Sequence, residues 1–422
     1  MPSFGRIFGE GSLALRRAFN LFLPSRQIRT FENVWEEDLA RYCPGGYHPV
    51  RIGDEFHSGR YKVVTKLGYG IYSTVWLARN LQNGGHVALK ILTADAYDGK
   101  KDTFELDILR CMASKTTQSP DIEPGSDRIL GLLDEFQHSG PNGKHVCLVF
   151  MPMGPNLSIY RRLFPKLRIP IPVAKNIARQ LLQALAFLHD TCHIIHTDIK
   201  PQNVLIKTQE INEMFDRAPS EVFLQQSPPV NPPENFYMQS EPVSSGEEDL
   251  SKTIGISVKL ADFGVASWFD KHLTEWIQPQ MLRAPEVILN AGWNHKVDIW
   301  NLGLIIWELV QGQLCFDGQA TATAPYSSEA HLAQMTAILG SFPVSLLERS
   351  QSRDKFFDSQ GHLLSEIHFP PVSLKSLNAG NGTLEGQEAD DFVDFIQETI
   401  ALEPERRPDA RQLLQARWLQ DV

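Results

Sequence analysis

Residues 194–206 read Ile-Ile-His-Thr-Asp-Ile-Lys-Pro-Gln-Asn-Val-Leu-Ile, and this stretch decides the fold. It places a carboxylate at Asp198, an ammonium at Lys200 and a carboxamide at Asn203 between apolar residues typical of short strands. A purely structural loop has little need of three such groups. Asp198 can accept a hydroxyl proton, Lys200 can balance charge on a transferring phosphoryl group, and Asn203 can bind a divalent cation.

A second acidic turn follows at Val258-Lys259-Leu260-Ala261-Asp262-Phe263-Gly264. An acid placed on a turn directly after an apolar strand can present its carboxylate to a metal ion, while Phe263 packs inward. Arg283-Ala284-Pro285-Glu286 comes next, and Asp298-Ile299-Trp300 then opens a predicted helix. Each short motif alone is common, but their ordered occurrence in one chain is not.

A glycine-rich segment lies upstream, where Gly68-Tyr69-Gly70-Ile71-Tyr72-Ser73 forms the turn of a predicted hairpin. Because glycine has no Cβ, backbone N–H groups in such a turn can approach phosphate oxygens. A tight hairpin also needs glycine for its own sake, so the motif alone leaves a structural role equally open. Ser73 stands where the G-x-G-x-x-G pattern has its third glycine.

Lys90 ends the strand-like run Val87-Ala88-Leu89-Lys90, about twenty residues after the glycine turn. A lone lysine in a strand is more often a solvated charge than a ligand. From this position, however, its ammonium can reach phosphates beneath the glycine turn. A buried lysine needs a carboxylate partner. Glu105 on a predicted helix is the first candidate, and Asp107 and Asp102 are the alternatives.

The surrounding pattern predicts an α+β protein with a small first lobe and a larger, mainly helical second lobe. Alternating β-branched and aromatic residues predict strands, and apolar residues spaced three to four apart predict helices. The first lobe is expected to contain strands at 61–70, 73–79, 86–92, 129–137 and 145–152 and a helix at about 101–112. The second lobe is expected to contain helices at 173–190, 297–310, 331–340, 390–404 and 410–419.

Two segments have a composition that sets them apart from these lobes. Residues 208–252 are rich in Pro, Ser, Gln and Glu, cannot bury enough apolar surface to offset their ordering entropy, and are predicted to form a flexible insertion. Residues 1–31 carry five arginines and a single acid among apolar residues. This arm resembles a mitochondrial transit peptide, and the alternative is a loosely attached arm. The predicted division is an arm at 1–40, an extension at 41–60, a first lobe at 61–153 and a second lobe at 154–422.

The composition excludes several classes of protein. The 422 residues carry 40 Lys and Arg against 50 Asp and Glu, a formal charge of -10, which argues against direct nucleic-acid binding and favours a basic partner. The five cysteines form no Cys-x-x-Cys pair, so neither a disulfide framework nor a zinc site is indicated. No apolar run approaches the roughly 18 residues of a membrane span, so no membrane association is expected.

The ordered set of motifs resembles that of the eukaryotic protein kinases, over about residues 61–419. The resemblance implies a bilobal protein kinase fold, with a small antiparallel sheet and one main helix in the first lobe, and ATP and Mg²⁺ as cofactors. It implies catalytic roles for Asp198, Lys200, Lys90 and Glu105, and metal binding by Asn203 and Asp262. The residues implied to bind the nucleotide are Leu67, Gly68, Gly70, Ser73, Val75, Ala88, Lys90, Met151 and Met153.

The same resemblance implies three supporting roles. Phe150 is expected at the gatekeeper position, directly before the segment that contacts adenine. Glu286 and Arg407 are expected to form a buried ion pair in the second lobe. Asp298 is expected to anchor the loop that carries Asp198.

Finer features are similar to the SR protein kinase family, in particular Cys43–Asp54, Tyr72–Leu77, His196-Thr197-Asp198 and His272–Glu275. This resemblance implies a serine/threonine kinase that phosphorylates serine in Arg/Ser-rich or basic proteins and takes part in mRNA splicing regulation. A monomer in the cytoplasm or nucleus is expected, with mitochondrial targeting by the arm as the alternative. Two other functions stay open: an inert kinase-fold scaffold, and an active kinase of the same group with other substrates.

Two positions within this resemblance have consequences for regulation and docking. Most kinases have arginine at the position of Thr197, where it pairs with an activating phosphate. Threonine cannot make that charge-assisted contact, so activity is predicted to be independent of phosphorylation of the activation segment. The family's acidic docking helix aligns here with Ala330 and Ala337, which argues against docking of long arginine-rich tracts.

Overall fold

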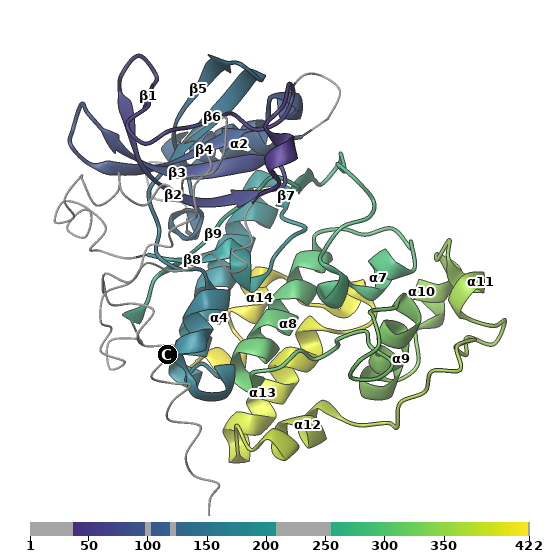
Figure 1. The fold of residues 1–422 in the computed structure, drawn as a ribbon. Coiled ribbons are helices and arrows are strands. Elements are labelled where there is room, and N and C mark those ends of the chain that lie inside the picture. The colour runs from purple at the N-terminus through teal and green to yellow at the C-terminus, as the bar shows by residue number, and fades with distance from the viewer. Residues whose placement is uncertain (1–36, 98–102, 119–123, 208–254, 421–422) are drawn as a thin grey trace, which may run out of the picture. The chain divides into compact units, whose positions relative to one another are not determined.

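A six-stranded antiparallel sheet forms the first lobe, with strand order β1-β2-β3-β4-β6-β5 (Figure 1). The computed structural model of the chain describes residues 37–97, 103–118, 124–207 and 255–420. Most of the predicted arm and all of the predicted insertion at 208–252 therefore lie outside the described residues. The strands are β1 (Glu55–Phe56), β2 (Tyr61–Gly70), β3 (Ser73–Asn80), β4 (His86–Leu92), β5 (Leu132–Gly140) and β6 (Gly143–Phe150).

The sheet is covered on both faces because alternate side chains of its central strands are apolar on both sides. On β4, Val87, Leu89 and Ile91 join a cluster that includes Val50 and Phe56 of the preceding extension. The intervening residues Ala88 and Leu92 face the other side, toward helix α2 (Glu105–Gln118) and the main core. Successive residues of a strand point to opposite faces, so the same strand serves both clusters and aims Lys90 toward α2.

The glycine-rich segment is the turn between β2 and β3. Gly68 pairs with Val75, and Gly70 pairs with Ser73 across a two-residue turn. Register shifts on β2 interrupt the ladder between Val63 and Thr65 and again between Lys66 and Gly68. Such bulges increase strand twist, and here they precede the glycine turn.

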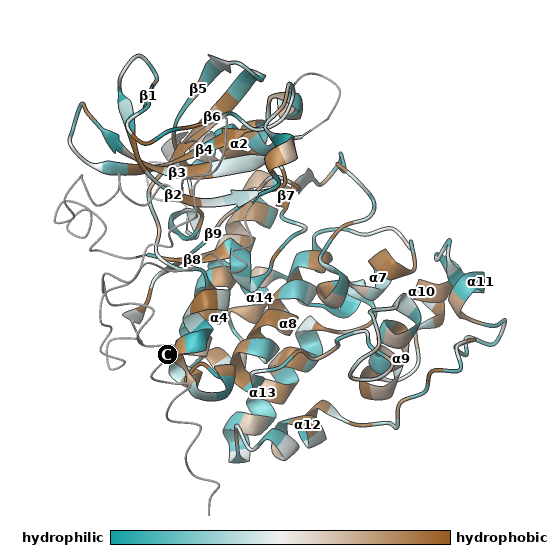
Figure 2. Ribbon diagram, viewed as in Figure 1, coloured by the Kyte–Doolittle hydropathy of each residue, from teal (hydrophilic) through white to brown (hydrophobic). Residues whose placement is uncertain are grey.

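The second lobe is mainly helical, as expected, and its centre is α8 (Lys296–Gln311). Every residue of α8 after Lys296 is buried, and Figure 2 shows apolar segments along it. Two long helices pack on α8: α4 (Ile171–Ala186) and α13 (Gly386–Thr399). The other α-helices of this lobe, within the ranges that the structure describes, are α3 (Leu157–Tyr160), α7 (Pro285–Ile288), α9 (Ser328–Leu339), α10 (Val344–Glu348), α11 (Arg353–Phe356), α12 (Leu374–Asn381) and α14 (Ala410–Leu413).

Two small strand pairs carry the polar loops of the sequence motifs. β8 (Val204–Ile206) pairs with β9 (Val258–Leu260), and β7 (Ile194–Ile195) pairs with β10 (Ser267–Trp268). The apolar residues that flank Asp198 in the sequence are therefore strands, as the motif predicts. Among the described residues, no helix combines the length and apolar character that crossing a bilayer requires.

Several elements differ from the sequence-based expectation, and the causes of three differences are identifiable. Helix α2 begins at Glu105, whose N–H bonds to Thr103 Oγ1 at 3.3 Å, so Thr103 ends the preceding segment. Helix α14 stops at Leu413, and the chain turns so that Trp418 packs against Phe392 and Phe395 of α13. The two-residue strand β1 is too short for any periodicity to be visible. With these changes, the expected bilobal α+β fold is confirmed.

Candidate active site

Lys90 is the centre of the first polar cluster. Its Nζ lies 2.5 Å from Glu105 Oε1 and 3.0 Å from Asp262 Oδ1. Burial disfavours the Lys90 charge, but the carboxylates of Asp262 and Glu105 outweigh this effect and raise the Lys90 pKa. The ammonium of Lys90 in turn lowers the pKa of Asp262 to about 2. Both groups are therefore charged at neutral pH and available for phosphate and metal binding.

Glu105 is the partner that the structure gives to Lys90, as the sequence favoured. It is the first residue of α2 and is 4% exposed. The alternative Asp107 lies 3.9 Å from Arg110 of the same helix, and the alternative Asp102 lies outside the described residues. Helix α2 is also tied to the acidic turn, because Thr103 Oγ1 donates a hydrogen bond to the Gly264 carbonyl at 3.4 Å.

Asp198 is the centre of the second polar cluster. Its Oδ2 accepts hydrogen bonds from Lys200 Nζ at 2.7 Å and from Asn203 Nδ2 at 2.9 Å. Asn203 Nδ2 also lies 2.9 Å from the Asp198 carbonyl oxygen, which fixes the loop between them. The side chains of Asp198 and Lys200 are 16% and 30% exposed, so a substrate hydroxyl can reach them. A carboxylate oriented in this way can accept a proton from a bound hydroxyl.

The strand pair β8–β9 connects the two clusters. Val204 pairs with Leu260, and the Ala261 N–H donates to the Asn203 carbonyl at 2.9 Å. Asn203 directly precedes β8, and Asp262 follows β9 by two residues, so both emerge at the same end of the pair. Residues that are far apart in the sequence are thereby brought into one site.

The loop of Asp198 is anchored by Asp298, as expected. Asp298 is fully buried and accepts the backbone N–H groups of His196 at 2.8 Å and Thr197 at 2.9 Å. Its third partner is His189 Nε2 at 2.9 Å. Burial alone would raise the Asp298 pKa, but these donors and the nearby imidazoles outweigh it and lower that pKa. The anchor is an ionised carboxylate that holds the loop through its backbone.

Both polar loops contain a residue in the left-handed region. Thr197 has φ +65° and Asp262 has φ +66°, conformations that cost energy for residues other than glycine. Thr197 is fully buried, and its Oγ1 donates to the Val265 carbonyl at 2.8 Å. Phe263 is buried and packs its ring against His196, with ring centroids 4.9 Å apart. The strain at both sites is therefore held by specific bonds and packing.

The predicted nucleotide-binding residues line one region of the sheet. Gly68, Val75 and Lys90 form a row across β2, β3 and β4, and side chains directly opposite each other point to the same face. Ala88 lies two residues from Lys90 on that face and pairs with Phe150, whose side chain is buried as a gatekeeper requires. The other predicted residues lie at the edges of this region: Leu67 and Gly70 on β2, Ser73 at the start of β3, and Met151 and Met153 directly after β6.

The two predicted metal ligands fit Mg²⁺ by their donor types. Asp262 offers a carboxylate whose side chain is 52% exposed, and Asn203 offers a carboxamide oxygen. Mg²⁺ prefers oxygen ligands and usually keeps several waters and substrate phosphates, so two protein ligands suffice. Within the described ranges, no three His, Cys, Asp or Glu side chains come together as a metal-holding group. When bound, the ion would supply positive charge to neutralise phosphate oxygens.

Packing and hydrogen bonds hold the activation segment, residues 262–286. Ser267 of β10 is fully buried, and its Oγ accepts the Leu273 N–H at 3.0 Å. Phe269 stacks on His295 with ring centroids 5.0 Å apart and planes 7° apart. His272 stacks on Trp293 at 3.6 Å and 7°.

The expected ion pair between Glu286 and Arg407 forms behind the activation segment. Arg407 Nη1 and Nη2 lie 2.6 and 2.8 Å from the two oxygens of Glu286, and neither side chain is exposed. The guanidinium also lies over the Trp300 ring, 4.9 Å from its centroid. This pair joins the end of the activation segment to the C-terminal part of the lobe.

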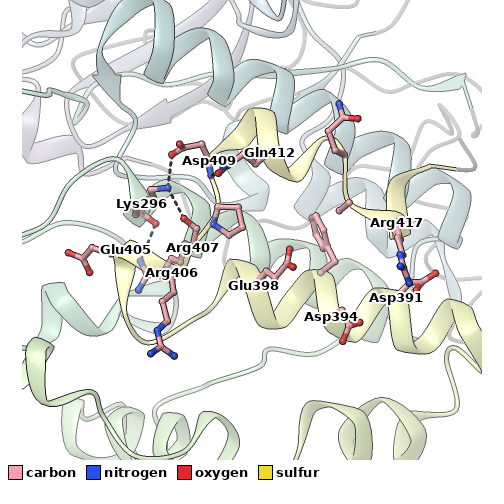
Figure 3. Close-up of a pocket in the computed structure, with 14 residues that line it drawn as sticks. Lys296, Asp391, Asp394, Glu398, Glu405, Arg406, Arg407, Asp409, Gln412 and Arg417 are labelled. Atoms are coloured by element: carbon pink, nitrogen blue, oxygen red, sulfur yellow. Dashed lines mark hydrogen bonds and ion pairs between the residues drawn. The ribbon is translucent and has the colours of Figure 1, made fainter.

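A hollow of about 740 Å³ in the second lobe lies apart from these clusters (Figure 3). None of the residues predicted to be catalytic or to bind nucleotide or metal line it, whereas Arg407 of the buried ion pair does. Carboxylates of α13, among them Asp394 and Glu398, line it together with basic residues of the neighbouring segments, including Lys296 and Arg406. Lys296 Nζ is bound to Asp409 Oδ1 at 2.5 Å. The hollow therefore mixes charges of both signs and does not form a single acidic surface.

The run of residues 378–405 contains eight acids and no Lys or Arg, a composition typical of either a solvated helix face or a surface that steers basic substrates. Several of its acids pair with bases outside the run: Glu388 with Lys175 at 2.7 Å, Asp390 with Lys375 at 2.6 Å and Glu405 with Arg349 at 2.5 Å. These pairs favour the interpretation as a solvated helix face.

Contacts of the extension were missed in the sequence. Residues 41–47 touch the glycine turn through Arg41 and Tyr47. Lys66 of β2 forms a buried ion pair with Glu37. The sequence shows no sign of these contacts. Contacts between residues about 30 positions apart produce no periodic pattern, so residue types alone do not show that Lys66 pairs with Glu37 or that Arg41 and Tyr47 reach the glycine turn.

Comparison with known proteins gives one consistent result. The model of the protein kinase domain matches residues 61–419. The chain is 34% identical to the serine/threonine-protein kinase SRPK of Physarum polycephalum, with 92% of each chain covered. It is 31% identical to protein kinase dsk1 of Schizosaccharomyces pombe, with 92% of this chain and 85% of that protein covered. It is 27% identical to SRSF protein kinase 3 of Homo sapiens, with 91% and 90% covered.

Proposed function

Since the chain belongs to the protein kinase family and, within it, to the SR protein kinases, we propose that it transfers the γ-phosphoryl group of ATP to serine in basic or Arg/Ser-rich proteins. The chain is a serine/threonine kinase, and its family implies ATP as the phosphoryl donor. The substrate class, the residue roles and the monomeric state are parts of the proposal.

The observation that carries the proposal is the convergence of two charged clusters at one end of β8 and β9. Lys90, Glu105 and Asp262 form the first cluster, in which both carboxylates lie within 3.0 Å of the Lys90 ammonium. Asp198 with its two donors forms the second. A scaffold that only keeps the fold has no need for both clusters, so their joint presence favours catalysis.

We assign the steps of transfer to the residues of these clusters. Asp198 accepts the proton of the substrate hydroxyl while the oxygen of that hydroxyl forms a bond to the γ-phosphorus of ATP. The bond from that phosphorus to the bridging oxygen breaks, and ADP leaves with the electron pair. Lys200 and Lys90 place positive charge near the transferring group and the remaining phosphates, and Glu105 keeps Lys90 in position. Asp262 and Asn203 hold the metal ion.

The preference for a basic substrate rests on charge and similarity. The net charge of -10 attracts cationic segments over long range. The exposed carboxylates of Asp270 and Glu275 lie on the activation segment itself. Ala330 is fully buried in α9, so that position offers no docking surface, and Glu329 is the acid at the start of this helix. We therefore propose recognition of single basic sites rather than docking of long arginine tracts.

A peptide array tests the substrate class. Purified protein is incubated with Mg²⁺, labelled ATP and serine peptides whose flanking residues are varied, beside an Asp198→Ala control. We expect incorporation to rise with flanking arginine and to vanish in the control. Equal incorporation into acidic and basic peptides would reject the substrate class while leaving the kinase intact, and wild-type signal equal to the control would reject catalysis.

A further inference from the structure

The segment Leu39–Tyr47, which precedes the sheet, is fixed to the first lobe by backbone bonds. The Gly45 N–H donates to the Asn142 carbonyl at 2.8 Å, and Asn142 Nδ2 donates to the Tyr47 carbonyl at 2.6 Å. The Ala94 N–H donates to the Gly46 carbonyl at 3.1 Å. A Cβ on Gly46 would lie 1.8 Å from the Arg41 carbonyl oxygen, so only glycine permits this tight turn. The segment is thus a rigid part of the lobe.

From this rigid base, two side chains reach the tip of the glycine turn. Tyr47 Oη donates to the Gly70 carbonyl at 2.8 Å and lies 3.2 Å from the Ile71 carbonyl. Arg41 Nη1 donates to the same Ile71 carbonyl at 2.5 Å. The Arg41 guanidinium lies over the Tyr47 ring, 4.9 Å from its centroid, so the two donors also hold each other.

The side chains at the tip of the turn are largely exposed. Ile71 is 69% exposed and Tyr72 is 46% exposed, so their side chains bury little apolar surface. Gly68 has no side chain to pack, and no atom lies within 4 Å of the position that a Cβ would take there. The backbone of the turn is held by its pairing in the β2–β3 ladder and by a bond from the Thr93 N–H to the Tyr72 carbonyl at 2.8 Å, and the Arg41 guanidinium also lies 6.0 Å from the centroid of the Tyr72 ring. Segments with few buried contacts open at low free energy, so the two donors on the Gly70 and Ile71 carbonyls lower how often the turn lifts.

We propose that Tyr47, with Arg41, is a positioning residue that holds the glycine turn down over the nucleotide phosphates and slows the release of ADP. The inference rests on the proposed role of Gly68 and Gly70 in covering those phosphates. Neither Tyr47 nor Arg41 touches the reacting atoms; both act through the backbone of the turn. When the turn is closed only part of the time, the apparent affinity for a nucleotide beneath it equals the intrinsic affinity multiplied by the fraction of time the turn is closed.

The competing explanation is that these bonds serve only the stability of the sheet. Tyr61, at the opposite end of β2, provides a matched control, because it is also a buried tyrosine whose hydroxyl donates a hydrogen bond, to Asp134 Oδ2 at 2.7 Å. Tyr61→Phe removes a comparable hydrogen bond at the other end of β2, the strand that ends at Gly70, and leaves the glycine turn unchanged. Tyr47→Phe keeps the ring under Arg41 and removes only the hydroxyl.

The experiment measures nucleotide binding separately from catalysis. The dissociation rate and equilibrium affinity of fluorescent mant-ADP are followed by stopped flow for the wild type, Tyr47→Phe, Arg41→Gln and Tyr61→Phe. KM values for ATP and for an Arg/Ser peptide are measured in parallel. We expect Tyr47→Phe and Arg41→Gln to speed mant-ADP dissociation by roughly three- to tenfold, as for the loss of one hydrogen bond. KM for ATP rises by a similar factor, and KM for the peptide and the values for Tyr61→Phe stay near wild type.

The outcomes separate the inference from the function on which it rests. If the wild type fails to bind mant-ADP, the proposed function fails and the inference fails with it. If the wild type binds but Tyr47→Phe and Arg41→Gln release ADP at the wild-type rate, only the inference is wrong. An equal change in Tyr61→Phe would assign the effect to the sheet as a whole and also overturn it. Should Tyr47→Phe not fold, Arg41→Gln decides alone, because Arg41 is a surface donor to the turn.

Discussion

Removing the hydroxyl groups of the activation segment tests how that segment is held. The double variant Ser267→Ala, Thr274→Ala removes the two hydroxyl side chains of the segment. Ser267 is fully buried and accepts one N–H at 3.0 Å, so its loss costs about 0.5–1.5 kcal/mol of local stability. Thr274 is exposed, and its Oγ1 accepts the Trp276 N–H at the long distance of 3.4 Å, so its loss costs little.

The contacts that remain in this variant are sufficient to order the segment. The two aromatic stacks, Phe269 on His295 and His272 on Trp293, contribute about 1–3 kcal/mol together beyond their buried area. That sum is comparable to the charge-assisted bonds that an activating phosphate makes to arginine. Thr197 supplies no such arginine. We therefore expect the double variant to keep its turnover within about threefold of wild type, because the stacks outweigh one lost bond.

The assay is steady-state phosphorylation of a basic serine peptide by phosphatase-treated and untreated enzyme. Phosphatase treatment is expected to leave kcat unchanged, with mass spectrometry confirming removal of phosphate. As a contrasting variant, Phe269→Ala with His272→Ala loses both stacks and is expected to reduce kcat roughly ten- to hundredfold. If the alanine variant of Ser267 and Thr274 were inactive while its circular dichroism matched wild type, packing would not be what orders the segment.

Three further changes give measurable outcomes. Arg407→Leu leaves the buried carboxylate of Glu286 without its partner, so urea denaturation should show the free energy of unfolding lowered by about 3–5 kcal/mol; an unchanged midpoint contradicts this. Glu105→Gln weakens the charged bond to Lys90 and should lower kcat/KM for ATP roughly ten- to hundredfold, whereas Asp107→Asn, on the same helix, should not. Burial lowers the pKa of His48 to about 3 and also lowers that of His145, so the unfolded chain binds more protons between pH 6.5 and 3. For His48 this contribution is complete above pH 6.5 and falls toward a slope of about 1.4 kcal/mol per pH unit below it, a slope that His48→Phe should remove in urea melts at pH 7, 6 and 5, while the lowered pKa of His145 acts in the same direction.

Most of the fold follows from local patterns in the sequence. The strands at 61–70 and 86–92 were predictable because alternation and turn residues act over a few neighbours. The buried helix at 296–311 was predictable because its apolar residues cover the whole circumference. Where the prediction failed, as at the early end of α14, the cause was a distant partner: Trp418 turns the chain toward α13.

The candidate site was predictable to a similar extent and for a different reason. Asp198, Asn203 and Asp262 belong to an ordered series of short motifs, so their types and order revealed a common site. The sequence favoured Glu105 as the partner of Lys90 but left Asp107 open, because the two acids lie two residues apart on one helix. The structure decides between them, since Lys90 contacts Glu105 and Asp107 lies near Arg110. The role of Tyr47 could not be foreseen, because it acts on a backbone carbonyl, and a carbonyl leaves no trace in the amino-acid types.

Phosphoryl transfer by an Asp198→Asn variant measures the central claim most directly. The substitution keeps the size of the side chain and removes the carboxylate that accepts the proton. Wild type and variant are compared for label transfer from ATP to a basic serine peptide and, in parallel, for mant-ADP affinity. The account predicts that transfer falls at least roughly a hundredfold while mant-ADP affinity stays within about threefold of wild type. Wild-type transfer by the variant would contradict it.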